Sequence, residues 1–205
     1  MSTYLTLILL WTAWCIMHST LISQTADKFF KSLLKDNFRY FRLLYNGFAL
    51  VTIVPILTFS QSLKNQTIFT WDGILTPVWM VMWVIVVVLV VKGVKAYPMS
   101  VFLGVRQALS DSAEVNHTLS THGILGIVRH PWYLAALLFL WVRSYDIHLS
   151  MIIENLVLTL YLIIGVHLEE KKLIKIYGSQ YRSYQNRVSA LIPIKWFFSL
   201  SGSKE

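Results

Sequence analysis

Charged residues are scarce in this chain of 205 residues. Lys, Arg, Asp and Glu together make up 14% of it, whereas hydrophobic residues make up 56% and the mean hydropathy is +0.58. Soluble domains carry about 25% charged residues, so this composition excludes an ordinary soluble domain. We expect the chain to lie in a lipid bilayer.

Cysteine is almost absent, because Cys15 is the only one. It cannot form a disulfide within the chain, and its apolar surroundings in the sequence predict a buried free thiol that packs as a small hydrophobic side chain. Linkers rich in proline, glycine or serine are also missing, as are low-complexity tracts. The whole chain, residues 1–205, is therefore predicted to form a single membrane domain.

The short motifs of several common sites are missing too. No two histidines have the spacing H-x-x-x-H or H-E-x-x-H, so no metal site is predicted. The sequence has no G-x-S-x-G, P-loop or G-x-G-x-x-G motif. The net charge of +8 arises from basic residues spread over separate loops, which argues against nucleic-acid binding.

Long apolar runs dominate the rest of the chain. A span of the hydrocarbon core needs about 20 apolar residues, and most of the runs approach that length. The run after Pro131 has only about eleven, so it crosses only if its flanks add length. We predict an all-α integral membrane protein with a C-terminal segment 169–205 and five transmembrane helices, at about residues 3–23, 43–60, 75–91, 131–145 and 151–168.

Basic residues alternate between the loops that separate these spans. Of the 18 Lys and Arg residues, 16 fall in segments 24–42, 92–130 and 169–205. Cytoplasmic loops are enriched in Lys and Arg, so we expect these three segments and the C-terminus in the cytoplasm and the N-terminus outside. The spacing of Phe and Leu in segment 24–42 also predicts an amphipathic helix on the membrane surface.

Two polar pairs stand at the cytoplasmic edge of the last two runs. Arg129 and His130 precede Pro131 at a predicted helix start, where free amides attract an anion. Glu169 and Glu170 follow the last run, where a carboxylate can bind a cation or hydroxyl groups. The alternative is that Arg129 and His130 anchor lipid headgroups and that the glutamates pair with the basic tail. Adjacent helical residues point about 100° apart, so the two glutamates are not expected to share one role.

The order of residues from Leu119 to Pro193 is more informative than either pair alone. It contains Leu119, Gly123, Arg129-His130-Pro131-x-Tyr133, Glu169-Glu170-x-x-Leu173 and Tyr177-Gly178-x-x-Tyr181-x-x-Tyr184. This pattern resembles the integral-membrane methyltransferases of the isoprenylcysteine carboxyl methyltransferase and phospholipid methyltransferase superfamily. The resemblance implies a cytoplasmic S-adenosyl-L-methionine site formed by the last helical hairpin and the C-terminal helix. The residues that it assigns to the cofactor are Leu119, Gly123, Arg129, His130, Pro131, Tyr133, Glu169 and Glu170.

The N-terminal half narrows the resemblance to one subgroup. Segments His18-Ser19, Arg42 to Asn46 and Phe102 to Gln107 are similar to bacterial methanethiol S-methyltransferases and NnrU-like proteins, which implies a bacterial inner membrane. Two positions depart from the superfamily. Leu125 replaces a tyrosine near the cofactor, and Gly165 replaces an arginine of the isoprenylcysteine branch, which argues against a carboxylate substrate. The substrate-side candidates are His18, Tyr45, Asn46, Arg106 and Gln107.

The predicted function is therefore methyl transfer from S-adenosyl-L-methionine to a small or lipophilic thiol, giving dimethyl sulfide if the thiol is methanethiol. Such a displacement needs alignment and a deprotonated nucleophile, and a thiol with a pKa of about 8.5 needs little help. His130 and Arg129 are the predicted catalytic residues that supply it. Three alternatives remain: an isoprenylcysteine carboxyl or phospholipid methyltransferase, an NADPH-dependent membrane reductase sharing the R-H-P-x-Y segment, and a non-catalytic NnrU-like membrane protein.

Overall fold

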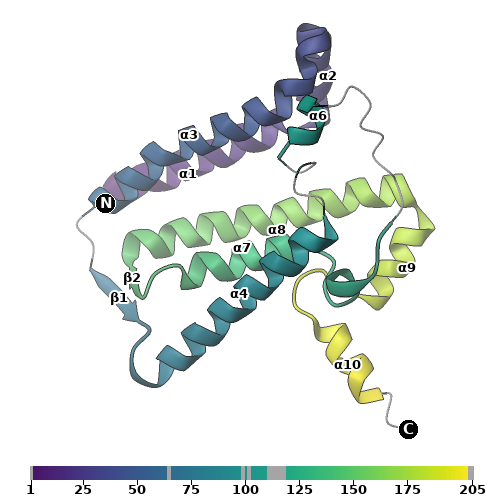
Figure 1. Ribbon diagram of the computed structural model, residues 1–205. Coiled ribbons are helices and arrows are strands. Elements are labelled where there is room, and N and C mark those ends of the chain that lie inside the picture. Colours follow the sequence, from purple (N-terminus) through teal and green to yellow (C-terminus); the bar gives the residue numbers. More distant parts are fainter. Residues whose placement is uncertain (1, 64–65, 98–99, 101–102, 110–118, 203–205) are drawn as a thin grey trace. The chain divides into compact units, whose positions relative to one another are not determined.

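The computed structural model describes residues 2–63, 66–97, 100, 103–109 and 119–202, and most of these residues are helical (Figure 1). They form two compact units. The first unit takes the described residues of segments 1–70, 98–115 and 146–158, and the second takes those of 71–97, 116–145 and 159–205. One helix, α8 (Leu149–Tyr177), continues from the first unit into the second.

The first unit is built on two antiparallel apolar helices joined by a short amphipathic helix. Helix α1 (Ser2–Leu21) packs against α3 (Phe41–Ser62), and Leu7, Trp11 and Ile56 form their buried core. Cys15 is a buried free thiol, as predicted. The side chain of Ser23 accepts a hydrogen bond from Ala26 N at 3.2 Å and so caps the amphipathic helix. The elements are α1 (Ser2–Leu21), α2 (Gln24–Leu34), the 3-10 helix η1 (Lys35–Tyr40), α3 (Phe41–Ser62) and α6 (Val105–Leu109).

A small antiparallel sheet in the first unit was not predicted. Strand β1 (Thr67–Thr70) pairs with β2 (Asp146–His148), with Thr67 opposite His148 and Thr70 opposite Asp146. Thr70 Oγ1 also donates to Asp146 Oδ1 at 2.8 Å. Strands of three and four residues are too short to show an alternating pattern, which explains why the sequence predicted loops there.

A buried polar pair in the first unit was missed as well. Ser60 on α3 donates to Glu154 Oε2 on α8 at 2.9 Å, and both residues are buried. A carboxylate within an apolar helix is costly without such a partner. The bond therefore ties α3 to the first turns of α8.

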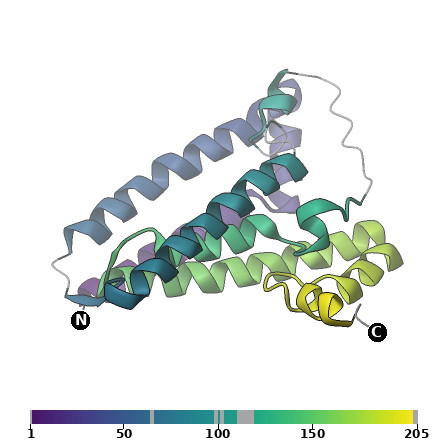
Figure 2. The ribbon, with the colours of Figure 1, turned by 60° about the horizontal axis from the view of Figure 1, so that its bottom comes forward.

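The second unit surrounds the short helix α7 (Pro131–Val142). Helix α4 (Thr76–Ala96) packs along it (Figures 1 and 2), and a Cβ at Gly93 would lie 3.1 Å from the Trp132 ring, so a larger residue there would require that ring to shift. The indole groups of Trp79 and Trp83 each donate to Val142 O at 2.8 Å, which satisfies a carbonyl at the end of α7. The other elements are η2 (Gly73–Leu75), α4 (Thr76–Ala96), η3 (Gly123–Gly126), α9 (Ser179–Arg187) and α10 (Ile194–Gly202).

Four helical stretches among the described residues are long and apolar enough to cross a membrane. They are Ser2–Leu21, Gln24–Ser62, Gly73–Ala96 and Leu149–Tyr177, whereas α7 has 12 residues. Many large apolar side chains on these helices are exposed, which suits contact with lipid tails. The prediction of apolar membrane-length helices is thus confirmed, and the count of five spans and their orientation stay predictions.

Candidate functional site

The site in the second unit starts from the three residues before α7. The helix begins at Pro131, as predicted, and Val128 forms a parallel bridge with Ser189. Arg129 N donates to Ser189 O at 2.9 Å, and His130 N donates to Ala190 O at 3.0 Å. The backbone of this segment is therefore held against the segment that joins α9 to α10.

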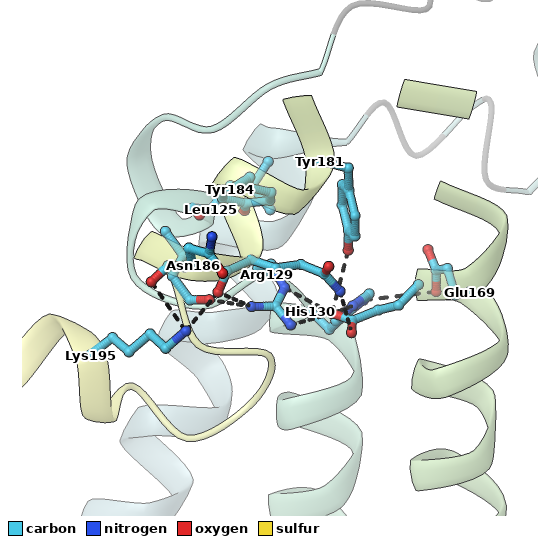
Figure 3. A network of polar contacts seen from close by, with 11 residues as sticks. Leu125, Arg129, His130, Glu169, Tyr181, Tyr184, Asn186 and Lys195 are labelled. Carbon is cyan, nitrogen blue, oxygen red and sulfur yellow. Dashed lines mark hydrogen bonds and ion pairs between the residues drawn. The ribbon is translucent and has the colours of Figure 1, made fainter. Parts of the chain in front are cut away.

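The Arg129 guanidinium lies between α8 and the end of α9 (Figure 3). Its Nε donates to Glu170 Oε1 at 2.8 Å, and its Nη2 contacts the same oxygen. Its Nη1 donates to Gln185 O at 3.3 Å and contacts Val188 O. Only 7% of the Arg129 side chain is exposed, so all these bonds form away from water and join three segments.

Glu170 receives further donors on both carboxylate oxygens. His130 Nε2 lies 3.2 Å from Oε1, and Tyr181 donates to Oε1 at 3.4 Å. Gln185 Nε2 donates to Oε2 at 2.9 Å. The side chain is 16% exposed. Glu170 therefore serves as the centre of an internal network, and its acceptor positions are directed at protein groups.

Glu169 has a different environment from its neighbour. Its side chain is 42% exposed, and its Oε2 lies 3.9 Å from His130 Nδ1. The Tyr133 hydroxyl is also close enough to this carboxylate to interact with its charge. Of the two glutamates, Glu169 is the one that faces accessible space, which agrees with the expectation that the pair divides its roles.

A reversal of the chain at Gly178 brings α9 back beside α8 (Figure 2). Gly178 has φ +56°, a conformation that suits glycine, and its N–H donates to Ile174 O at 2.9 Å. Tyr181 and Tyr184 on α9 then pack against α8, and Tyr184 donates to Leu125 O. Burial raises the pKa of both hydroxyls above the usual value near 10, so both stay protonated and can donate at neutral pH.

Replacing Tyr184 with phenylalanine is expected to lower the free energy of unfolding by about 1–3 kcal/mol. The Leu125 carbonyl would lose a buried donor, and an unsatisfied buried acceptor costs about that much. Thermal unfolding of the purified protein, followed by circular dichroism, measures the change. Tyr181→Phe is the matched control and should cost less, because Glu170 keeps its other donors. Equal losses in the two variants would contradict the assignment.

The structure shows what surrounds Leu125 and Gly165, the two residues that depart from the superfamily pattern. Leu125 is 2% exposed, and its carbonyl accepts the Tyr184 bond, so this position serves the packing of α9. Gly165 on α8 lies under the Tyr133 ring, and a Cβ there would be 3.1 Å from Tyr133 Cε1. An arginine at this position would require Tyr133 to move.

The structure brings together five of the predicted cofactor residues: Arg129, His130, Tyr133, Glu169 and Glu170. Pro131 starts the helix between them, and Leu119 packs against the buried cluster of α9 tyrosines. Gly123 opens η3 with φ +62°, and a Cβ there would meet nothing within 4 Å. The assignment of these residues to a cofactor, and of His130 and Arg129 to catalysis, stays a prediction.

The substrate-side candidates all lie in the first unit. The Tyr45 hydroxyl is 2.6 Å from His18 Nε2, and Asn46 Nδ2 donates to Leu103 O at 3.0 Å. The His18 ring also stacks on Trp14, with ring centroids 4.9 Å apart. Arg106 and Gln107 lie on α6, and Phe102 of the same predicted segment lies outside the described residues.

Two residues of the second unit were missed by the sequence. The Gln185 side chain donates to Glu170. The two residues lie close together because the chain reverses at Gly178. Tyr97, just after α4, has its pKa raised to about 12 by burial of its hydroxyl and by the charge of Glu169, although 42% of the whole residue is exposed. Tyr97 is an aromatic neighbour of Glu169 that no sequence motif had indicated.

Comparison with known proteins identifies relatives for part of the chain. A methanethiol S-methyltransferase of Pseudomonas deceptionensis is 37% identical over 93 residues, which are 44% of this chain and 35% of that protein. Methanethiol S-methyltransferase 1 of Bradyrhizobium diazoefficiens is 39% identical over 66 residues, or 32% of this chain and 23% of that protein.

Part of the chain is similar in sequence to proteins named methanethiol S-methyltransferase. A third such protein, from Crocosphaera subtropica, is 31% identical over 93 residues, or 44% of this chain and 36% of that protein. The similarity predicted from residue order is thereby confirmed. The matched part of the chain spans about a third or less of the length of these curated relatives. No family model and no solved structure matches the chain.

Proposed function

We propose that the chain is a membrane methyltransferase that uses S-adenosyl-L-methionine to methylate a small or lipophilic thiol. The observation that carries this proposal is its similarity to proteins named methanethiol S-methyltransferase. The second unit supports it, because Arg129, His130 and the glutamate pair form an ordered polar cluster at the end of an apolar helix.

The chemistry of the second unit suits this cofactor. S-adenosyl-L-methionine would supply a methyl group carried on a positively charged sulfonium, together with an ammonium, a carboxylate and hydroxyl groups. Glu169 is the accessible carboxylate for the cationic or hydroxyl groups. The neighbouring rings of Tyr133 and Tyr97 favour a cation by cation–π attraction. The N-terminus of α7 has no side-chain cap and favours a carboxylate.

We propose that His130 accepts the proton of the thiol and that Arg129 holds the residues of the site in position. The acceptor sulfur must lose its proton before it bonds to the methyl carbon, because the thiolate is the nucleophile. His130 Nδ1 faces Glu169, on the accessible side of the cluster. Arg129 is held by Glu170 and by the carbonyls of Gln185 and Val188, and so keeps α8 and α9 in register.

The packing at Gly165 favours a thiol over a carboxylate acceptor. In the isoprenylcysteine branch, by resemblance, an arginine occupies this position. Here the Tyr133 ring covers Gly165, so a longer side chain would require that ring to move. His18, Tyr45, Asn46, Arg106 and Gln107 stay the substrate-side candidates, as the residue order predicts.

The test uses the purified full chain in lipid nanodiscs with methyl-labelled S-adenosyl-L-methionine and a series of thiols that includes methanethiol. We expect labelled dimethyl sulfide from methanethiol and a measurable heat of cofactor binding. No transfer to any thiol, together with no cofactor binding, would reject the proposal. A parallel titration with NADPH serves as the control for the reductase alternative, which would be favoured by nicotinamide binding in place of S-adenosyl-L-methionine.

A further inference from the structure

Helix α10 carries an apolar face that is largely exposed. Ile194, Phe197 and Phe198 are spaced three and four residues apart, so they lie on one side of the helix. They are 52%, 60% and 71% exposed. Trp196 lies on another side, where it is half-buried and contacts the edge of the Phe197 ring with centroids 5.1 Å apart. We expect this exposed apolar face of α10 to contact another molecule.

The opposite side of α10 is firmly attached to the rest of the second unit. Lys195 N donates to Ser189 Oγ at 3.1 Å, and its Nζ donates to Gln185 O at 2.7 Å and to Asn186 O at 3.2 Å (Figure 3). These carbonyls end α9, where the helix dipole is negative and a lysine is favourable. The orientation of the apolar face is therefore set by specific bonds.

The charge of the surrounding segment has one sign. From Lys171 to Lys204 the chain has seven Lys and Arg residues and no Asp or Glu. A short helix with a hydrophobic face in a basic segment is typical of one that lies in the membrane interface and contacts anionic lipids. With nine residues, α10 is about 14 Å long, too short to cross the bilayer.

We propose that α10 lies flat on the surface of an anionic bilayer, with Ile194, Phe197 and Phe198 among the acyl chains. A second copy of the chain fits this face less well. An aromatic side chain buries about 150–250 Å², so two phenylalanines and one isoleucine offer roughly 500 Å², below the ~800 Å² per partner of a stable interface. A bilayer is the occupant already indicated for this unit, because the stretch Gly73–Ala96, which contains α4, has membrane length and hydropathy.

The attachment of α10 to the bilayer is linked to the hydrogen-bond network of Glu170 through one carbonyl. Gln185 O accepts from Lys195 on α10 and from Arg129 Nη1, and the Gln185 side chain donates to Glu170. A lipid-bound α10 therefore holds the end of α9 against Arg129. The proposal concerns membrane attachment and stands independently of the methyl-transfer proposal.

The test measures where two faces of α10 lie in nanodiscs. On a Cys15→Ala background, Phe198→Cys and, as the matched control one residue along, Ser199→Cys are labelled with an environment-sensitive dye. In nanodiscs containing phosphatidylglycerol, we expect the dye at 198 to be quenched severalfold more by a quencher on the lipid acyl chains than by aqueous iodide. The dye at 199 should show the reverse order. Replacing phosphatidylglycerol with phosphatidylcholine should reduce the difference.

Two results would overturn the proposal. Equal quenching by iodide at both positions would place α10 in water, and protection of position 198 from both quenchers would indicate a protein partner. Phe197→Cys, labelled in the same way, repeats the measurement on the same face if the first variant folds poorly. The readout requires no methyl transfer, so an inactive protein would still decide the question.

Discussion

Replacing Glu170 with alanine is expected to lower the free energy of unfolding by about 3–5 kcal/mol. The variant leaves Arg129, 7% exposed, without the carboxylate that it contacts, and breaking one partner of a buried ion pair costs about that much. His130, Tyr181 and Gln185 lose an acceptor as well. For a chain of this size the midpoint of thermal unfolding should fall by roughly 6–20 °C.

The matched control is Glu169→Ala, which removes the same side chain one residue earlier on the same helix. Because Glu169 is 42% exposed, its loss should change the free energy of unfolding by only about 0.5 kcal/mol. Circular dichroism of both variants in the same detergent makes the comparison. If the two variants unfold at the same temperature, Glu170 does not organise the site as described.

Replacing Glu169 with glutamine is expected to weaken binding of S-adenosyl-L-methionine about 10–150-fold. The substitution keeps the shape of the side chain but removes its charge, and a hydrogen bond to a charged group contributes about 1.5–3 kcal/mol. The fold should be preserved, because Glu170 and Arg129 keep all their contacts. Isothermal calorimetry of the full chain in detergent measures the change in affinity.

Lys171→Gln provides the control for this second experiment. Lys171 is exposed and follows the glutamate pair directly. Its replacement changes the net charge by one unit, so this variant tests whether local charge alone affects binding. We expect its affinity to match that of the wild-type protein. A Glu169→Gln variant that binds the cofactor as tightly as wild type would remove Glu169 from the proposed site.

The membrane helices could be predicted because a bilayer imposes simple requirements on a sequence. Each predicted span overlaps a helix of the structure, from α1 at the span 3–23 to α8 at the span 151–168. Hydropathy reports burial in lipid and needs no knowledge of packing. The pairing of β1 with β2 and the bond from Ser60 to Glu154 were not predictable in this way, since they join segments about 76–94 residues apart.

The sequence predicted which residues form the site but not how they are arranged in space. Residue order indicated Arg129, His130, Glu169 and Glu170, and their contacts in the second unit agree with that grouping. The sequence predicted that the two glutamates differ in role but not which of them faces inward, because both follow the same apolar run. Their separation into an internal and an accessible residue depends on which side of α8 meets Arg129 and α9.

The sequence by itself determined that this chain has apolar helices of membrane length and a basic C-terminal segment, because composition and residue order carry that information, and it predicted which residues would form a methyltransferase-like site. The tertiary structure alone decided that Glu170 is enclosed and Glu169 accessible, that Tyr133 covers Gly165, and that Gln185 joins the network. These facts depend on the reversal at Gly178 and on contacts between residues distant in the chain, and such contacts arise only when the helices pack.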